Sequence, residues 1–312
     1  MSSVRPRFEV SELLKVFQAT GNGMPLETLE IDQNIFFVRG KQRGRFPYSN
    51  SLVIKGRVLL DLGLGLDIVR KLADRVEFAA LTHIHPDHCG GAWIFNEWGK
   101  RVLSPEGYET SVDALARRFV DASLREDWKR FAMNVVGLRD FEVEPYSDGD
   151  TILRNPEITA MRLPGHTEDH HIFIIDGRIV FGSDIDLTSF GPWYGNPESD
   201  IKKFMRSIER AMELDAEIFV SGHEDPVFGR DEIVERLQIY LEIFEKRNEL
   251  LLGLLDKPKT LEELVEISPF YRKKPYIKNI LDFFEGQMIR KHLNLLIERG
   301  KVTEFNGEFQ TV

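Results

Sequence analysis

The stretch "LTHIHPDHCGG" at residues 81–91 contains three histidines and one aspartate within six positions: His83, His85, Asp87 and His88. It follows a short apolar run that is typical of a buried strand, and helical periodicity resumes after the Gly pair. Imidazole and carboxylate groups are good ligands for divalent transition metals. Loops between a strand and a helix are also the usual place for active sites in α/β proteins. The stretch therefore predicts a metal site in an α/β fold.

The composition is that of an ordinary globular protein. The chain has 312 residues, of which 42% are hydrophobic and 29% charged, enough for one large domain or for a large and a small one. A net charge of −10 argues against a generally basic, nucleic-acid-binding surface. No stretch approaches the length of a membrane span, and the start at residues 1–14 does not predict a signal peptide. The single cysteine, Cys89, excludes an internal disulfide and favours a cytoplasmic location.

Residues 29–230 alternate between strand-like and helical segments. Short β-branched and aromatic runs at 27–40, 50–63, 78–84, 157–165, 171–185 and 216–226 predict strands. Asp176 and Gly177 predict a two-residue hairpin turn. Helical patterns occupy parts of 63–77, 90–100, 108–137 and 198–214. We expect one α/β domain over residues 1–230.

The pattern changes after residue 230. Residues 231–255 predict a long helix, and Thr260 with Glu263 has the spacing of a capping box. A further helix is expected at about 278–299, followed by a hairpin around Asn306 and Gly307. Helices followed by a terminal hairpin predict a small, winged-helix-like domain over residues 231–312.

The histidines cluster at the ends of predicted strands. Seven of the eight lie in three places, and Asp184 ends another apolar run; these positions are 83/85/88, 166/170/171, 223 and 184. The carboxyl ends of strands can converge on a single pocket. On an extended segment His83 and His85 point the same way and can bind one ion, while Asp87 and His88 lie beyond the turn and can reach a second. Two ions about 3.5–4 Å apart would generate hydroxide near neutral pH.

A lone histidine after a strand is more often structural than a ligand, but three clusters with two aspartates favour a metal site. The motifs "THIHPDH" (82–88), "PGHTEDH" (164–170), "GSD" (182–184) and "SGHEDP" (221–226) occur in that order. With them the chain resembles the metallo-β-lactamase superfamily of metallohydrolases over roughly residues 25–230.

The resemblance implies a four-layer αββα sandwich with two divalent metal ions at one edge of its sheets. The ions are expected to be zinc, with iron or manganese as alternatives. The resemblance implies that the first ion is bound by His83, His85 and His166. It implies that the second is bound by Asp87, His88 and His223. Asp184 would then bridge the two ions, and Asp87 would also orient the attacking water.

Other residues have less certain roles. The segment "HTEDH" is similar to one in lactamase-β-like-2 endoribonucleases and related thioesterase-like proteins. There His170 would be a proton donor, or a hydrogen-bonding group near the metal ligands. His171 opens a strand and is interpreted as structural, and Cys89 as a packing residue. His292 lies in a C-terminal helix and is interpreted as a surface residue.

An aromatic loop follows Asp184. Phe190, Trp193 and Tyr194 are placed to form a wall of a substrate pocket, although at least one of them is expected to pack against the next helix. Arg45 and Tyr48 are candidates to reach the site from the N-terminal strands.

The preferred function is a hydrolase that uses a dinuclear-metal-bound hydroxide on a small ester, thioester or lactone. The glyoxalase II branch shares the metal set, but "THIHPDH" lacks the extra histidine usual there, and the C-terminal part is not its glutathione-binding module. A homodimer through the apolar face of residues 231–255 is compatible with the sequence.

Three alternatives stay open. An endoribonuclease or phosphodiesterase of the lactamase-β-like-2 type is indicated by "HTEDH" and by the basic, aromatic segment "YRKKPYIK" at 271–278. A mononuclear-iron sulfur dioxygenase would use the equivalents of His83, His166 and Asp184. A DNA-binding regulator without catalysis would not need the full ligand set.

Overall fold

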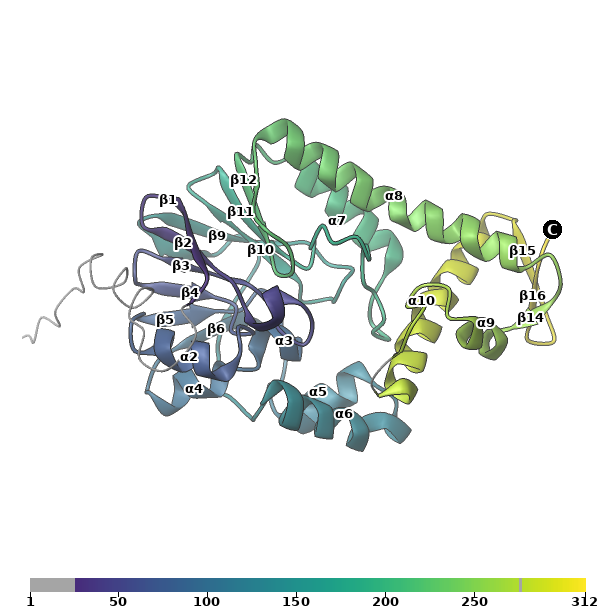
Figure 1. The fold of residues 1–312 in the computed structure, drawn as a ribbon, viewed down its shortest axis with the longest axis horizontal. Helices are drawn as coiled ribbons and strands as arrows, with labels where there is room; N and C mark the ends of the chain where they lie inside the picture. Colours follow the sequence, from purple (N-terminus) through teal and green to yellow (C-terminus); the bar gives the residue numbers. More distant parts are fainter. Residues whose placement is uncertain (1–25, 275–276) are drawn as a thin grey trace, which may run out of the picture.

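The computed structural model describes residues 26–274 and 277–312. Two β-sheets lie face to face, and helices cover both outer faces (Figure 1). The prediction that residues 1–14 are not a signal peptide concerns residues outside the described ranges. No helix in the described ranges has the length and apolarity needed to cross a membrane.

The first sheet contains seven strands in sequence order. They are β1 (Thr28–Asp32), β2 (Ile35–Val38), β3 (Ser51–Ile54), β4 (Val58–Leu60), β5 (Phe78–Ala80), β6 (Val102–Pro105) and β7 (Glu144–Tyr146). The first four pair antiparallel, and β4 to β7 pair parallel. The carboxyl ends of β4 and β5 therefore open onto the same edge.

The second sheet has the order β13-β12-β11-β10-β9-β8. Its strands are β8 (Thr151–Arg154), β9 (Glu157–Arg162), β10 (His171–Ile175), β11 (Ile179–Ser183), β12 (Ile218–Ser221) and β13 (Val227–Phe228). The predicted hairpin joins β10 to β11, with Asp176 and Gly177 both at positive φ. The parallel pair β11 and β12 brings the residues that follow both strands to one edge.

Alternation of side chains along the strands explains the layers. In β2, Phe37 packs between the sheets, while Phe36 packs against the helices on the outer face. In β10, Phe173 packs between the sheets and Ile172 against the helices on the other side. Three separate hydrophobic clusters thus fill the three interfaces of four layers. The αββα architecture of the metallo-β-lactamase fold is confirmed.

Amphipathic helices form the outer layers. The layer on the first sheet contains α2 (Leu66–Ala73), α4 (Ala92–Glu97), α5 (Val112–Phe119) and α6 (Arg125–Phe131), the last continuing into a π-helical turn at Ala132–Val136. The layer on the second sheet contains α7 (Ile201–Glu213) and α8 (Arg230–Leu254). The ligand-rich stretch itself forms the loop after β5 and the single turn α3 (Pro86–Cys89).

The C-terminal region continues from α8. It comprises β14 (Lys259–Thr260), α9 (Leu261–Ile267), α10 (Lys278–Glu298), β15 (Val302–Phe305) and β16 (Glu308–Thr311), with a small sheet in the order β14-β16-β15. The capping box of Thr260 and Glu263 is present as predicted. Helix α10 begins beside α6, where Asn279 donates to Asp127, and runs to the small sheet (Figure 1). The division into domains at residue 230 stays a prediction.

Five short strands were not anticipated from the sequence: β6, β7, β8, β13 and β14. Each has four residues or fewer, which is too short for an alternating pattern to stand out. Pro145 within β7 also argues against a strand by propensity, and β7 tolerates it because it is the edge strand of its sheet.

Replacing Phe173 by alanine tests the core between the sheets. The side chain is fully buried, so Phe173→Ala is expected to lower the free energy of unfolding by about 3–5 kcal/mol in denaturant titrations. The control is Phe305→Ala, since that ring is 76% exposed, and it should change the stability by less than about 0.5 kcal/mol. Equal effects of the two variants would contradict the layered core.

Candidate metal centre

The structure brings the seven predicted ligands together at one edge of the two sheets. Three groups have ligand atoms within 4.8 Å of one another, and two of them contain the seven predicted ligands: His83, His85, His166 and Asp184, and Asp87, His88 and His223. The third consists of Asp184, Asp186 and His223. The predicted ligands come from the loops that follow β5, β9, β11 and β12 and from the turn α3. Residues far apart in the sequence thus meet in one cluster, with the composition and spacing of a binuclear metal site.

Asp184 lies between the two groups of predicted ligands. Its Oδ2 atom is 3.0 Å from Nε2 of His83 and 3.0 Å from Nε2 of His166. Its Oδ1 atom is 3.0 Å from Nε2 of His223. This is the position of a carboxylate that bridges two cations.

The donor atoms fit a metal better than they fit one another. The Nε2 atoms of His83 and His88 are buried and have no hydrogen-bond partner within the described part of the chain. In a tetrahedral zinc site with bonds of about 2.0–2.1 Å, ligand atoms lie about 3.3–3.4 Å apart. The separations of 3.0 Å between His83 Nε2 and Asp184 Oδ2 and 3.2 Å between His88 Nε2 and Asp184 Oδ2 are close to this value.

The other nitrogen of several of these imidazoles is held by an oxygen atom. His88 Nδ1 lies 2.8 Å from Asp61, His166 Nδ1 2.9 Å from the Trp193 carbonyl, and His223 Nδ1 2.7 Å from the Gly44 carbonyl. A carbonyl or carboxylate oxygen can only accept, so each of these Nδ1 atoms carries the proton. In the neutral ring each Nε2 is then a lone pair directed at the centre of the cluster.

Asp61 is a candidate residue of this site that was not predicted from the sequence. It follows β4 at a positive φ of 59° and is fully buried. Its Oδ1 accepts from the backbone N–H of Thr82 at 2.7 Å, while Oδ2 accepts from His88. The sequence pattern that could have identified Asp61 is "VLLD" at 58–61, in which a carboxylate directly follows an apolar strand. The run that ends at Asp184 shows the same pattern.

His170 is close to the cluster but is held by the backbone. Its Nδ1 donates to the Leu163 carbonyl at 2.9 Å, and its Nε2 accepts from the backbone N–H of Asp184 at 3.3 Å. Burial lowers the pKa of His170 to about 3, so the ring is neutral. Of its two predicted roles, these contacts favour the one in which His170 positions the loop of Asp184.

Three other sequence interpretations have clear outcomes. Cys89 is buried, as expected for a packing residue, and His171 opens β10 and is also buried. The interpretation of His292 as a surface residue was wrong. It is fully buried, lies 2.7 Å from Oδ1 of Asn248 through Nδ1, and contacts the Tyr194 hydroxyl at 2.5 Å.

The C-terminal region holds the loop that carries the aromatic residues. Arg247 of α8, 5% exposed, donates to the carbonyl groups of Phe190 and Pro192 and to the Tyr194 hydroxyl. Lys291 of α10 donates to the Asn196 carbonyl. This loop also supplies the Trp193 carbonyl to His166 and the Asn196 side chain to His85. The orientation of two predicted metal ligands therefore depends on α8 and α10.

A cavity of about 450 Å³ opens onto the cluster, and five of the predicted ligands line it: His85, Asp87, His166, Asp184 and His223. Its remaining walls are largely apolar. They include Phe46, Phe119, Trp128, Phe131, Phe190, Trp193, Tyr271, Ile277, Ile280, Leu281 and Phe284. The last five come from the C-terminal region, so that region completes the cavity.

The predictions for residues around the cavity are partly confirmed. Phe190 and Trp193 line it, and so does Arg45. Tyr194 does not; it is fully buried and stacks on Phe244 of α8. Tyr48 does not line this cavity either, and faces a different pocket.

Four imidazoles of the cluster fall into two pairs, whose pKa values are shifted in opposite directions. Burial lowers the pKa values of His83 and His85 well below the usual range, with the neighbouring imidazoles adding to the effect. Burial also opposes the charged form of His223, but contact with Asp184 outweighs it and raises its pKa to about 9. The pKa of His88 is likewise raised well above normal by Asp184 and Asp61, against burial.

Comparisons with known proteins agree with this geometry. The sequence profile of the family described as the metallo-beta-lactamase superfamily matches residues 44–223. The acyl-coenzyme A thioesterase MBLAC2 of Gallus gallus is 29% identical over 212 residues, covering 58% of this chain and 67% of that protein. The lactamase-like protein aptB of Emericella nidulans is 22% identical over 249 residues, 76% of this chain and 70% of that protein.

Among solved structures, a metallo-beta-lactamase family protein from Thermus thermophilus superposes with a TM-score of 0.66 at 22% identity. The alignment covers 92% of this chain and 98% of that one. At this identity the likeness concerns the fold alone, and it extends through the C-terminal region.

Asp61→Asn tests whether the contact between Asp61 and His88 contributes to metal binding. Asparagine keeps an oxygen acceptor for Thr82 but removes the negative charge beside His88, so metal affinity is expected to fall about 10–100-fold. The measurement is competition against a chromophoric chelator. Asp215→Asn, an exposed position, serves as the control. Unchanged metal affinity in Asp61→Asn would show that this contact is not needed.

Metal loading is expected to release protons at neutral pH. With a pKa of about 9, His223 is protonated below that pH in the metal-free protein, whereas a metal ligand must be neutral. Affinity should therefore rise by about tenfold per pH unit for each proton displaced, and level off above pH 9. Calorimetry near neutral pH in buffers with different ionisation enthalpies measures the proton count. A binding enthalpy that does not depend on the buffer would contradict this assignment.

Proposed function

Because the chain is a hydrolase that belongs to the metallo-beta-lactamase superfamily, we propose that its substrate is a thioester with an apolar acyl group. The observation that carries the proposal is the cavity of about 450 Å³, whose largely apolar walls lead to the predicted metal ligands. An acyl chain in this cavity would place its carbonyl group beside Asp87 and Asp184. The names of the MBLAC2 relatives, acyl-coenzyme A thioesterases, support the same substrate class.

We propose that two divalent ions are held by the seven residues of the cluster, in the division that the sequence predicts. His83, His85 and His166 form one set, Asp87, His88 and His223 the other, and Asp184 joins them. Bound there, two such ions would polarise the carbonyl group of the substrate and lower the pKa of water. Zinc is the proposed metal, because histidine and carboxylate ligands at this spacing suit it.

Asp87 is the proposed group that orients the attacking water. It lines the cavity, and burial raises the pKa of its carboxyl group, with Asp184 acting in the same direction. A carboxylate with a raised pKa is a better proton acceptor near neutral pH. Its Oδ2 atom lies 3.7 Å from His223 Nε2, so it can also act as a ligand there.

The leaving group decides between thioesters and other acyl compounds. A thiol has a pKa of about 8.5, so a thiolate departs without first being protonated. An alkoxide or an amine would need a proton donor. His170 bonds to the backbone through both nitrogens and is neutral, so a reaction that does not require it as an acid fits this site best.

The structure gives less support to a nuclease. Within the basic segment at 271–278, Lys274 is nearly buried and pairs with Glu285 at 2.6 Å and with Asp282 at 2.7 Å. Lys278 also pairs with Asp282. Lys274 is thus already neutralised inside the protein, and Lys278, whose side chain is 72% exposed, is paired at the surface. Of the described residues that line the cavity, Arg45 is the one lysine or arginine, which is little charge for a phosphate channel.

The C-terminal region is proposed to be a winged-helix-like module that acts as a wall of the active site. Helices α9 and α10 followed by the hairpin of β15 and β16 match this interpretation. Its contribution of Tyr271, Ile280 and Phe284 to the cavity supports a role in substrate binding rather than in DNA binding. Dimer formation and a cytoplasmic location stay predictions.

A series of thioesters with acyl chains of increasing length tests the proposal. Each methylene that enters the cavity contributes about 0.8 kcal/mol, so kcat/KM should rise about fourfold per methylene until the cavity is full. Removing the metal with a chelator should abolish activity, and zinc should restore it. Asp184→Asn should lower kcat by about a hundredfold or more, with Asp215→Asn as the exposed control.

Three outcomes would count against the proposal. Hydrolysis of RNA or of a phosphodiester, with thioesters untouched, would favour the nuclease. A single bound iron that survives His223→Ala would favour the sulfur dioxygenase. Thioester hydrolysis that does not depend on chain length would show that the acyl group does not enter the cavity.

A further inference from the structure

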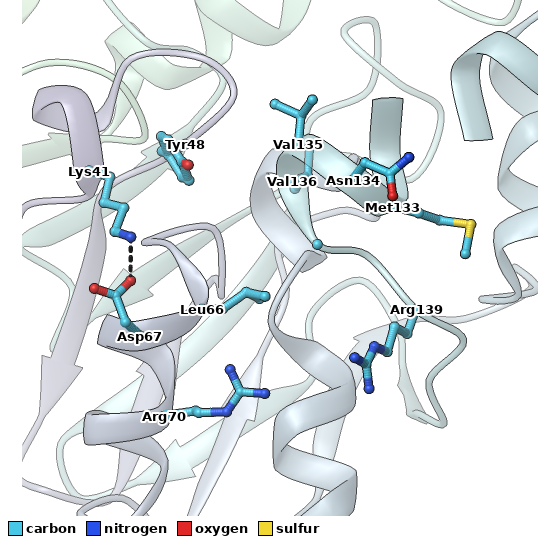
Figure 2. A pocket seen from close by; sticks show the side chains of 11 residues that line it. Lys41, Tyr48, Leu66, Asp67, Arg70, Met133, Asn134, Val135, Val136 and Arg139 are labelled. Carbon is cyan, nitrogen blue, oxygen red and sulfur yellow. Dashed lines mark ion pairs between the residues drawn. The ribbon is translucent and has the colours of Figure 1, made fainter. Parts of the chain in front are cut away.

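A second pocket lies beside the metal cavity and shares no lining residue with it among the described parts of the chain. It has a volume of about 420 Å³ and is bounded by three segments (Figure 2). These are the loop with Lys41 and Tyr48, the start of α2, and the π-helical turn with the residues that follow it. Its lining residues play no part in the function proposed above.

The pocket carries an excess of positive charge on a chain whose net charge is −10. Lys41, Arg70 and Arg139 line it together with one carboxylate, Asp67, which pairs with Lys41 at 2.6 Å. Across the described residues, no carboxylate lies within ion-pair distance of Arg70. The pairing of Arg139 is a long contact of 3.8 Å with Glu97. Two guanidinium groups are thus left largely uncompensated.

Both guanidinium groups contact the ring of one residue, Trp93. The guanidinium carbons of Arg70 and Arg139 lie 5.0 Å and 4.0 Å from the centre of its ring. Figure 2 shows the two side chains directed toward each other across the pocket. The indole is 4% exposed and is fixed by a hydrogen bond of 2.9 Å from Nε1 to the Gly137 carbonyl. One buried ring therefore fixes the position of both charges.

This arrangement is suited to an anion. Cation–π contacts with one indole stabilise each guanidinium and keep two positive charges within about 9 Å of each other, without a carboxylate to compensate them fully. An anion in the pocket that both arginines line would offset these charges and accept forked hydrogen bonds from the guanidinium groups. We propose that this pocket binds the phosphate groups of a phosphorylated organic molecule.

Apolar side chains give the pocket room for the organic part. Tyr48 and Leu66 line it, and so do Met133 and Val135, each of which is 50% exposed. Half-exposed apolar groups next to paired arginines suit a ligand that carries both a flat or apolar moiety and phosphate groups. A free inorganic ion would leave these side chains uncovered.

The two pockets are neighbours across one aromatic pair. Phe46 and Phe131 stack with ring centres 5.6 Å apart, and both line the metal cavity. Tyr48 and Met133, two residues further along each segment, line the second pocket. A thioester whose acyl group fills the metal cavity can therefore extend its thiol half past this pair. The assignment of the bound phosphate to the thiol half of the substrate rests on the proposed function.

The test compares Arg70→Gln and Arg139→Gln with the matched control Lys71→Gln, which removes one charge from an exposed position on the same helix as Arg70. Binding of coenzyme A and of inorganic diphosphate to the metal-loaded protein is measured by calorimetry. Steady-state kinetics are measured with one acyl group carried on coenzyme A and on N-acetylcysteamine, a thiol without phosphate. Circular dichroism and thermal melting establish that the substitutions leave the fold intact.

Each arginine variant is expected to bind coenzyme A about tenfold more weakly and to raise the KM of its thioester to a similar extent. Its kcat, and the kinetics with the N-acetylcysteamine thioester, should not change. Coenzyme A should bind much more tightly than diphosphate, and its binding should weaken with added salt. Lys71→Gln should match the wild type.

Other results separate the two proposals. If the arginine variants bind coenzyme A and diphosphate as the wild type does, or if the wild type binds neither, the phosphate pocket is overturned. If neither thioester is hydrolysed but coenzyme A binding falls in the arginine variants, the proposed function fails and the pocket stands as a site for a separate phosphorylated ligand. Tight binding of diphosphate alone would overturn the proposal that the organic part is recognised.

Discussion

The contact of one buried carboxylate with several imidazoles is the constraint on which this structure depends. Asp184 lies within 3.2 Å of Nε2 of four histidines: His83, His88, His166 and His223. Gathering so many polar groups away from water is costly unless they are paired or bind metals. The outward bonds of the imidazoles, to Asp61 and to backbone carbonyls, hold the rings in place. The inward nitrogens surround Asp184 in an arrangement that is consistent with a binuclear metal site.

The sandwich makes this contact possible because it brings strand ends from both sheets to one edge, and the C-terminal region then shapes what surrounds it. The loop after β5 belongs to the first sheet, and the loops after β11 and β12 belong to the second. Arg247 and Lys291 hold the aromatic loop from behind, and that loop contacts His166 and His85. The same region supplies Phe284 to the wall of the cavity. A change in α8 or α10 would therefore alter both the predicted metal ligands and the cavity beside them.

The sequence by itself determined the fold and predicted the residues that the structure gathers into the cluster. Histidines and aspartates directly after apolar runs marked the strand ends, and the order of the motifs identified the sandwich. Local signals such as the Asp176–Gly177 turn and the Thr260 capping box were equally readable, because they depend on neighbouring residues alone. Asp61 showed the same local pattern but lacked a histidine motif to draw attention to it.

Only the tertiary structure decided which side chains share a surface. His292 has the sequence context of a solvent-facing helical residue, yet it is buried against Tyr194 and Asn248, which are 98 and 44 positions away. Arg70 and Arg139 both contact Trp93 although nothing in the sequence links them. Periodicity shows which face of an element is buried, but not which distant element covers it. That choice is made by packing among residues far apart in the chain, and no local pattern records it.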